Sequence, residues 1–217
     1  MTAETRTERT LSSASDEYLW DVAGETGSHS YLLPVVTAEL KRLHARKVLD
    51  LGCGNGAFTA QLRNAGYDMT GLDHSSSGVA LAQRQYPRIA FARHDLHDPL
   101  PPAHTGKYDA VVAVEVIEHL LLPRRLMDAA TAALRPGGAL VVTTPYHGYL
   151  KNLAIALTGK FDEHWAPLRD YGHVKFFSRR TLSALFDEYG YTDLCFRTAG
   201  RVPPLAKSMV VTGILRA

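Results

Sequence analysis

Two carboxylates and an imidazole end a hydrophobic run in the segment "VEVIEHL", residues 114–120. Glu118 and His119 lie three and four residues after Glu115, so a helical turn would bring the three side chains to one side. Mixed oxygen and nitrogen ligands suit Mg²⁺, Mn²⁺, Fe²⁺ or Zn²⁺, and a fourth ligand is then expected. Without a metal, His119 is a candidate general base. The structural alternative is that Glu118 lies near the positive end of a short helix dipole while His119 has no role.

A glycine-rich segment, "VLDLGCGNGAF", provides a second candidate site. Gly52, Gly54 and Ala57 fit the dinucleotide pattern G-x-G-x-x-G/A, with Asp73 about twenty residues further on. However, Asp50 places a carboxylate at the mouth of this loop, where it would repel the pyrophosphate of a dinucleotide. The same carboxylate favours a cationic ligand without phosphate. S-adenosylmethionine, with its sulfonium and ammonium groups, is such a ligand.

The elements that must position these residues alternate between strands and helices. The expected strands are "KVLDLG", "DMTGLD", "RIAFARHD", "YDAVVAVE" and "ALVVTT". The expected helices cover residues 57–65, 76–86 and 123–134, and "RPGG" is expected to be a turn. This alternation predicts βαβ units, an α/β fold with a mostly parallel sheet, and ligands at the carboxyl ends of the strands. A helix at 178–189 and strands near 191–198 and 207–215 predict a final hairpin.

The N-terminal part differs from the rest of the chain. Residues 1–13 are rich in Thr, Ser, Arg and Glu, which predicts a disordered tail. Apolar spacing between residues 16 and 43 predicts helices beside the sheet, broken near "GETGSHS". A chain of 217 residues with 46% hydrophobic content suits one domain, here residues 14–217.

Four segments, "VLDLGCGNG", "GLDHS", "HDL" and "LRPGGALVVTTP", resemble the motifs of class I S-adenosylmethionine-dependent methyltransferases in order and spacing. The resemblance implies a Rossmann-like, seven-stranded sheet with an antiparallel C-terminal hairpin and helices on both faces. It also implies that Asp73 holds the ribose hydroxyls and that Asp95, with Leu96, reads the adenine edge. The alternative is that these acids cap helices or lie at solvated loop ends. The full set predicted to bind the cofactor is Asp50, Gly52, Cys53, Gly54, Asp73, His74, Asp95, Leu96 and Glu115.

The run "EVIEH" resembles two groups of methyltransferases in particular. These are the ubiquinone-pathway catechol O-methyltransferases and the small-RNA 3′-end 2′-O-methyltransferases, in which Glu-x-x-Glu-His and a later histidine hold a metal. His173 matches the later histidine, and His147 and His164 are competitors. The resemblance implies catalytic roles for Glu115, Glu118 and His119, and a divalent cation such as Mg²⁺ held by Glu115, Glu118, His119 and His173. Such a cation would hold two vicinal hydroxyls and lower the pKa of one of them.

Residues 146–177 interrupt the regular alternation and are expected to form a lid over the acceptor. A short amphipathic helix, flanked by Lys151 and Lys160, is predicted by the spacing of Leu150, Leu153, Ala154 and Leu157. We interpret its apolar stripe as packing onto the sheet. The alternative is an apolar lid, residues 146–160, that touches a membrane or receives a prenylated acceptor, with the lysines at the headgroups.

The charge and composition limit the classes of partner. The formal net charge is +2, from 24 basic and 22 acidic side chains, so a nucleic-acid partner is not expected. The chain has no signal-like N-terminus and no run of about 18 apolar residues, which favours a cytoplasmic protein. Cys53 and Cys195 are interpreted as reduced thiols.

The leading hypothesis is therefore an S-adenosylmethionine-dependent O-methyltransferase. Its expected acceptor is a small hydroxylated molecule, either catechol-like or a polyprenyl phenol. Two alternatives stay open: a 2′-O-methyltransferase of RNA 3′ ends, and a non-catalytic S-adenosylmethionine-binding module. A nicotinamide dehydrogenase is disfavoured by Asp50.

Overall fold

The computed structural model describes residues 27–165, 167–168, 171–203 and 205–216, and the structural statements below concern these residues. The tail expected at residues 1–13 lies outside the described residues. The same holds for the first part of the helical region expected between residues 16 and 43.

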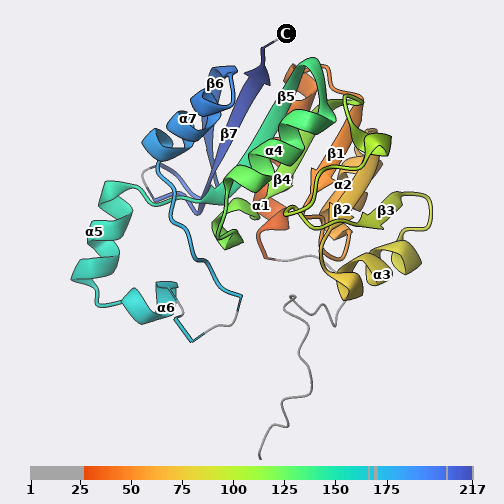
Figure 1. Cartoon of the computed structure of the whole chain (residues 1–217). Coiled ribbons are helices and arrows are strands. Elements are labelled where there is room, and N and C mark those ends of the chain that lie inside the picture. The colour runs from red at the N-terminus through yellow and green to blue at the C-terminus, as the bar shows by residue number, and fades with distance from the viewer. Residues whose placement is uncertain (1–26, 166, 169–170, 204, 217) are drawn as a thin grey trace, which may run out of the picture.

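A seven-stranded sheet forms the centre of the fold, with strand order β3-β2-β1-β4-β5-β7-β6 (Figure 1). Strands β1 to β5 pair in parallel, and β7 pairs antiparallel with both β5 and β6. The fold predicted from the motifs, with its C-terminal hairpin, is confirmed. The strands are β1 (Lys47–Leu51), β2 (Asp68–Asp73), β3 (Ala90–Arg93), β4 (Tyr108–Val114), β5 (Leu134–Pro145), β6 (Tyr191–Ala199) and β7 (Ser208–Leu215).

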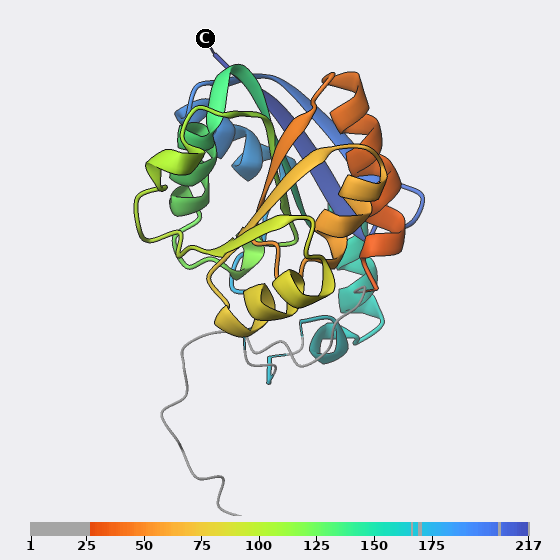
Figure 2. The ribbon, with the colours of Figure 1, turned by 90° about the vertical axis from the view of Figure 1, so that its right-hand side faces the viewer.

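Helices cover both faces of this sheet (Figure 2). The α-helices are α1 (His29–Arg42), α2 (Ala57–Asn64), α3 (Ser76–Gln85), α4 (Arg124–Ala133), α5 (Tyr149–Leu157), α6 (Phe161–Trp165) and α7 (Arg179–Glu188). Two short 3₁₀ helices, η1 (Pro102–His104) and η2 (Ile117–His119), flank β4. α7 begins as expected at Ser178, whose side chain forms a capping box with Thr181.

The core consists of two apolar layers, one on each face. In β4, Val111 and Ala113 belong to the layer under α4 and α7, whereas Ala110 and Val112 belong to the layer under α1, α2 and α3. Successive strand side chains point to opposite faces, so a strand covered on both faces is apolar at nearly every position. This rigid, doubly covered sheet fixes the carboxyl ends of β1, β2 and β4, where the candidate residues lie.

The start of β5 differs from the prediction. The segment "RPGG", residues 135–138, was predicted as a turn before the strand, but β5 already begins at Leu134. Leu134 pairs with Tyr108, and the pairing then shifts register before Ala139 pairs with Ala110. The glycines therefore lie within an irregular strand start, with Gly137 at φ 74°, instead of in a separate turn.

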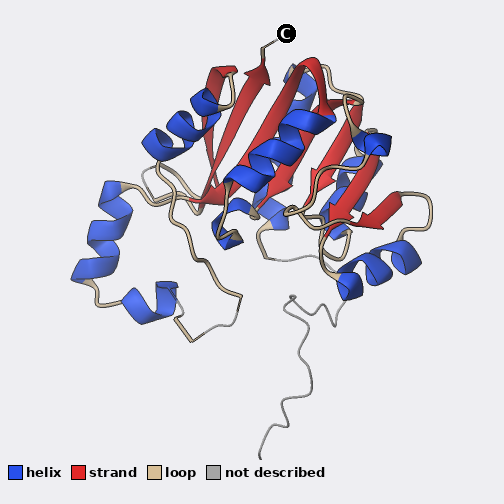
Figure 3. Cartoon of the chain, in the orientation of Figure 1, coloured by secondary structure: helices blue, strands red, loops and turns tan. Residues whose placement is uncertain are grey.

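The lid helix α5 also differs from the favoured interpretation, which was that its apolar stripe packs onto the sheet. None of its residues is buried, and Leu150, Leu153 and Leu157 are 53%, 40% and 79% exposed. α5 and α6 lie apart from the sheet, to the lower left in Figure 3. The packing interpretation is therefore wrong. The spacing of the leucines correctly predicted a helix. This helix extends away from the core, and no other element among the described residues covers its apolar stripe. No helix in the described part of the chain is long and apolar enough to span a bilayer.

Candidate active site

The glycine loop connects β1 to α2 through several left-handed residues. Gly52, Gly54 and Gly56 have φ of 86°, 53° and 77°, a region that favours glycine. Gly52 N–H donates to the Leu72 carbonyl at 2.7 Å, which ties the loop to the end of β2. A Cβ atom on Gly52 would lie 2.4 Å from the Val116 side chain. The loop therefore lies tightly against β2 and the segment after β4.

Asp73 ends β2 and holds this loop in place. Its Oδ2 accepts from Gly54 N–H and its Oδ1 from Ser75 N–H, both at 2.8 Å. The side chain is buried, and its role toward the ribose hydroxyls stays a prediction from the resemblance. A carboxylate offers about four acceptor positions, enough for two loop amides and two hydroxyls.

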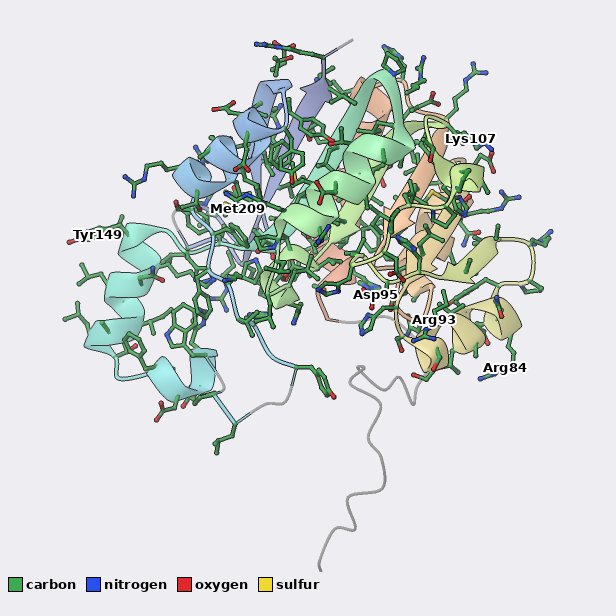
Figure 4. The ribbon with its side chains drawn as sticks, in the orientation of Figure 1. Arg84, Arg93, Asp95, Lys107, Tyr149 and Met209 are labelled. Atoms are coloured by element: carbon green, nitrogen blue, oxygen red, sulfur yellow. The ribbon has the colours of Figure 1, made fainter. Side chains whose placement is uncertain are left out.

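Asp95, Leu96 and His74 follow the ends of β3 and β2. Asp95 is exposed and lies at the lower edge of the sheet (Figure 4). Its Oδ1 accepts from the backbone N–H of His97 at 2.9 Å and contacts His97 Nδ1 at the same distance. These bonds lower the pKa of Asp95, so it is ionised at neutral pH and able to accept from an exocyclic amine.

Asp50 lies elsewhere than expected. The sequence suggested a carboxylate at the loop mouth, but this side chain is 1% exposed and accepts a 2.6 Å hydrogen bond from the Thr59 hydroxyl of α2. Burial raises its pKa to about 7, and the Thr59 bond only partly opposes that shift. Asp50 is not fully ionised at neutral pH, so it repels a pyrophosphate less strongly than the sequence led us to expect.

The raised pKa of Asp50 predicts a pH dependence of stability. The folded state binds a proton that the unfolded state has lost, so this group's contribution falls as pH rises from about 4 to about 7. Between pH 5.5 and 8 the free energy of unfolding should fall by about 2 kcal/mol more in the wild type than in Asp50→Asn, which cannot ionise. Urea denaturation of both proteins measures the difference. Parallel pH profiles would contradict the shift.

Glu118, His119 and His173 form the second part of the site. One ligand atom from each lies within 4.8 Å of the others. The Glu118 carbonyl accepts from Val174 N–H and Lys175 N–H, both at 2.9 Å, which fixes the segment that carries His173. The structure therefore brings together three of the four predicted ligands across more than fifty residues of sequence.

Glu118 is fully buried, and neither carboxylate oxygen has a hydrogen-bond partner among the described residues. Burial raises its pKa first and Glu115 second, while the nearby Thr144 hydroxyl opposes the rise. A buried carboxylate without a cation or donor is costly. A divalent cation between Glu118 and the two histidines would remove that cost, so the residues present fit a metal.

The contacts of His119 fix its tautomer. Its Nδ1 lies 3.0 Å from the Tyr171 carbonyl and 3.2 Å from the Gly172 carbonyl. Carbonyl oxygens only accept, so Nδ1 carries a proton and the lone pair of the neutral ring is on Nε2. Backbone support of this kind orients metal-binding histidines in proteins.

Glu115 is held apart from this cluster. It has a left-handed backbone, φ 55°, and its Oε1 and Oε2 accept from Thr143 Oγ1 at 2.8 Å and Ser208 Oγ at 3.2 Å. Burial raises its pKa to about 7. Because the chain turns before η2, Glu115 does not share the ligand group of Glu118 and His119, and its metal and cofactor roles stay predictions. No local pattern indicates Ser208 as a partner of Glu115, because it lies 93 positions away on β7.

The two competitor histidines lie in another cluster. His147 stacks on Trp165 with 4.9 Å between ring centroids, and His164 meets both rings edge-on. His173 instead lies 4.8 Å from the His119 ring. Of the three histidines considered from the sequence, the structure brings only His173 into the ligand group.

Comparison with known proteins identifies the family of this chain. A family model described as a methyltransferase domain matches residues 28–195. Ubiquinone biosynthesis O-methyltransferase of Hydrogenovibrio crunogenus is 26% identical over 178 residues, covering 79% of this chain and 73% of the relative. The protein of that name from Psychrobacter arcticus is 30% identical over 164 residues, covering 72% and 62%.

Solved structures agree as well. The methyltransferase domain of bacterial CtHen1-C aligns with a TM-score of 0.63 and 26% identity, covering 86% of this chain and 97% of that one. Magnesium protoporphyrin IX methyltransferase from Synechocystis PCC 6803, with bound SAH, has a TM-score of 0.63 at 20% identity, covering 86% and 82%, and supports the fold alone.

Proposed function

This chain belongs to the methyltransferase domain family and is an S-adenosylmethionine-dependent methyltransferase, and from that premise we propose that it methylates one hydroxyl oxygen of a small hydroxylated acceptor. The observation that carries the proposal is the Glu118, His119 and His173 cluster, which lies beyond the carboxyl end of β4. A buried carboxylate that has no hydrogen-bond partner among the described residues, together with two imidazoles, suits a site that binds and activates a hydroxyl. The relatives named as O-methyltransferases support the same chemistry.

In the proposed site, Glu118, His119 and His173 hold a divalent cation. When bound, such a cation lowers the pKa of a coordinated hydroxyl and neutralises the buried carboxylate. Methyl transfer from a sulfonium is an in-line displacement with a good leaving group, so the protein mainly has to orient the two reactants. Asp73 and the glycine loop would orient the cofactor, and Asp95 with Leu96 would hold its adenine. Glu115, held by Thr143 and Ser208, would contact the cofactor and not the cation.

The experiment that tests this proposal is a methyl-transfer screen with labelled S-adenosylmethionine. Catechols, polyprenyl phenols and short RNAs are offered as acceptors, each with Mg²⁺ and with EDTA. We expect label on a small catechol-like acceptor, with turnover that depends on the metal. Label on RNA 3′ ends alone would replace the small-molecule proposal. Binding of the cofactor without transfer to any acceptor would favour the non-catalytic alternative.

We also propose that the exposed stripe of α5 makes peripheral contact with a lipid surface, which would suit an acceptor with an apolar tail. The stripe has no cover among the described residues, and Lys160 follows it. Lys151, expected at the headgroups, instead turns back and donates from Nζ to the Tyr146 carbonyl at 2.9 Å. The contact would therefore depend mainly on apolar burial.

Leu157→Glu on α5 is expected to reduce co-sedimentation with anionic phospholipid vesicles about ten-fold or more, because Leu157 is 79% exposed and the substitution places a charge in the apolar stripe. The matched control is Val202→Glu, at an apolar residue 74% exposed outside α5. Equal binding of wild type and Leu157→Glu would contradict the membrane proposal and leave the methyl-transfer proposal intact.

A further inference from the structure

Three buried polar atoms near the lid have no hydrogen-bond partner within the described part of the chain. They are His147 Nδ1 after β5, Asn152 Oδ1 on α5 and Trp165 Nε1 on α6. Leaving a buried donor or acceptor unpaired is costly, and most such groups in proteins have partners. Three unpaired polar atoms in one lid, whose outer face is apolar, indicate that a ligand supplies their missing hydrogen-bond partners.

His147 contacts both of the other residues. The ring of His147 is stacked on Trp165 at an interplanar angle of 21°, and Phe176 meets Trp165 edge-on with 4.3 Å between centroids. Asn152 Nδ2 donates to the His147 carbonyl at 3.4 Å. These contacts hold the side chains in place, so the unpaired atoms are arranged before any ligand arrives.

The lid group lies beside the segment that carries His173. Phe176, three residues after His173, meets the His147 ring edge-on with 5.3 Å between ring centroids. Burial, with smaller contributions from Lys151, His164 and His173, lowers the pKa of His147 to about 4, so the imidazole is neutral at pH 7. A ligand held at Glu118, His119 and His173 would therefore lie next to the segment that contacts the lid group.

The donor and acceptor inventory defines the chemistry of the missing partner. An indole N–H only donates, an amide oxygen only accepts, and a neutral imidazole nitrogen can do either. A hydroxyl satisfies both the indole and the amide, because it accepts one hydrogen bond and donates another. A carboxylate has no hydrogen for Asn152, and an ammonium group has no lone pair for Trp165.

A hollow of about 210 Å³ lies beside His147, whose side chain is part of its lining, whereas Asn152 and Trp165 do not line it. The other walls include Tyr146, Tyr149, Phe177 and Met209, of which Tyr149 and Met209 are labelled in Figure 4. A cavity of about 150 Å³ accepts benzene, so this hollow has room for one substituted ring. Its aromatic walls suit such a ring.

We propose that His147, Asn152 and Trp165 form a polar subsite for a hydroxyl of the acceptor other than the pair held at Glu118, His119 and His173. The acceptor class is then a single aromatic ring with at least three hydroxyl groups. This inference rests on the proposed function, because it places the acceptor at the metal cluster. The subsite would be a second point at which the protein recognises the acceptor. It would set the orientation of the acceptor ring and thereby determine which oxygen is methylated.

The test measures binding of catechol, pyrogallol and 1,2,4-benzenetriol by calorimetry under anaerobic conditions, with S-adenosylhomocysteine and Mg²⁺ present. In the wild type, at least one triol should bind about ten-fold more tightly than catechol, as expected for one additional buried hydrogen-bonded group. Asn152→Leu and Trp165→Phe should each reduce this advantage to about two-fold or less while catechol affinity changes little. Asn64→Leu, at an exposed position on α2, is the matched control and should keep the full advantage.

The unfolding midpoint provides a second readout. Asn152→Leu removes the unpaired Oδ1 at nearly constant size and loses only the 3.4 Å hydrogen bond from Nδ2 to the His147 carbonyl, so its midpoint should stay close to that of the wild type. A clearly lower midpoint of Asn152→Leu would assign the amide to structure and overturn the subsite, as would a triol advantage that is absent in the wild type or retained in both variants. Triol preference without methyl transfer would keep the subsite and refute the proposed function. Equal methylation of catechol and triols would refute the subsite and keep the proposed function.

Discussion

Glu118→Gln is expected to lower metal-dependent methyl transfer by roughly 10²-fold or more, while affinity for S-adenosylmethionine changes only a few-fold. Glu118 is the carboxylate of the Glu118, His119 and His173 cluster, and glutamine has nearly the same shape without the charge. The variant should fold, because glutamine has nearly the same size and neither carboxylate oxygen of Glu118 has a hydrogen-bond partner to lose among the described residues. Initial rates with labelled cofactor, measured across a Mg²⁺ or Mn²⁺ titration, give the result.

The control and the stability readout separate a metal ligand from other roles. Glu163→Gln, at an exposed acid on the lid helix α6, should keep the wild-type rate. In the wild type, divalent metal should raise the unfolding midpoint, and this increase should be absent in Glu118→Gln. Full turnover in EDTA, together with an active Glu118→Gln variant, would refute the metal proposal. The methyltransferase assignment does not depend on that outcome, because it follows from the family.

If His119 acts as a general base, the pattern of results changes. His119→Ala would then lose activity whether or not metal is present, and EDTA would have no effect on the wild type. The contact of Nδ1 with the Tyr171 and Gly172 carbonyls places the lone pair on Nε2, which suits a base as well as a ligand. The EDTA arm therefore distinguishes the two roles of this histidine.

The strands and loops were predictable because their signals are local. Continuous apolar runs such as Tyr108–Val114 are what a strand buried on both faces requires, and glycines at 52 and 54 mark left-handed turns. The position of Asp73 followed from the same reasoning, because residues at the carboxyl ends of parallel strands meet at one edge of the sheet. Each of these features depends on residues close together in the sequence.

The features that were not predictable depend on contacts between distant residues. Glu115 turns toward Thr143 and Ser208 because hydroxyls on β5 and β7 hold it in a left-handed conformation. The 3.6-residue period can predict α5 but cannot say whether anything covers it. Asp50 was predicted to lie at the loop mouth. The sequence does not reveal that the Thr59 hydroxyl of α2 donates a hydrogen bond to it, which allows its carboxyl group to be buried.

The second large effect concerns the cofactor. Asp73→Asn is expected to weaken binding of S-adenosylmethionine and S-adenosylhomocysteine by about 10²-fold, measured by calorimetry. Both oxygens of Asp73 accept from backbone N–H groups, so an amide would turn its NH₂ toward one of these donors. It would also offer fewer lone pairs to the ribose. Asp98→Asn, at an exposed acid three residues after Asp95, should bind both ligands as tightly as the wild type does.

A ligand change separates ribose binding from support of the loop. If Asp73 holds the ribose hydroxyls, the 2′-deoxy analogue of S-adenosylhomocysteine should bind the wild type more weakly than the parent compound, and Asp73→Asn should remove most of that difference. If Asp73 only supports the loop, the two losses should add, as they do for independent interactions. The ribose role of Asp73 comes from the resemblance, whereas its hydrogen bonds to the loop are observed. Comparing two ligands on two proteins therefore shows whether the Asp73 carboxylate binds the ribose as well as supporting the loop.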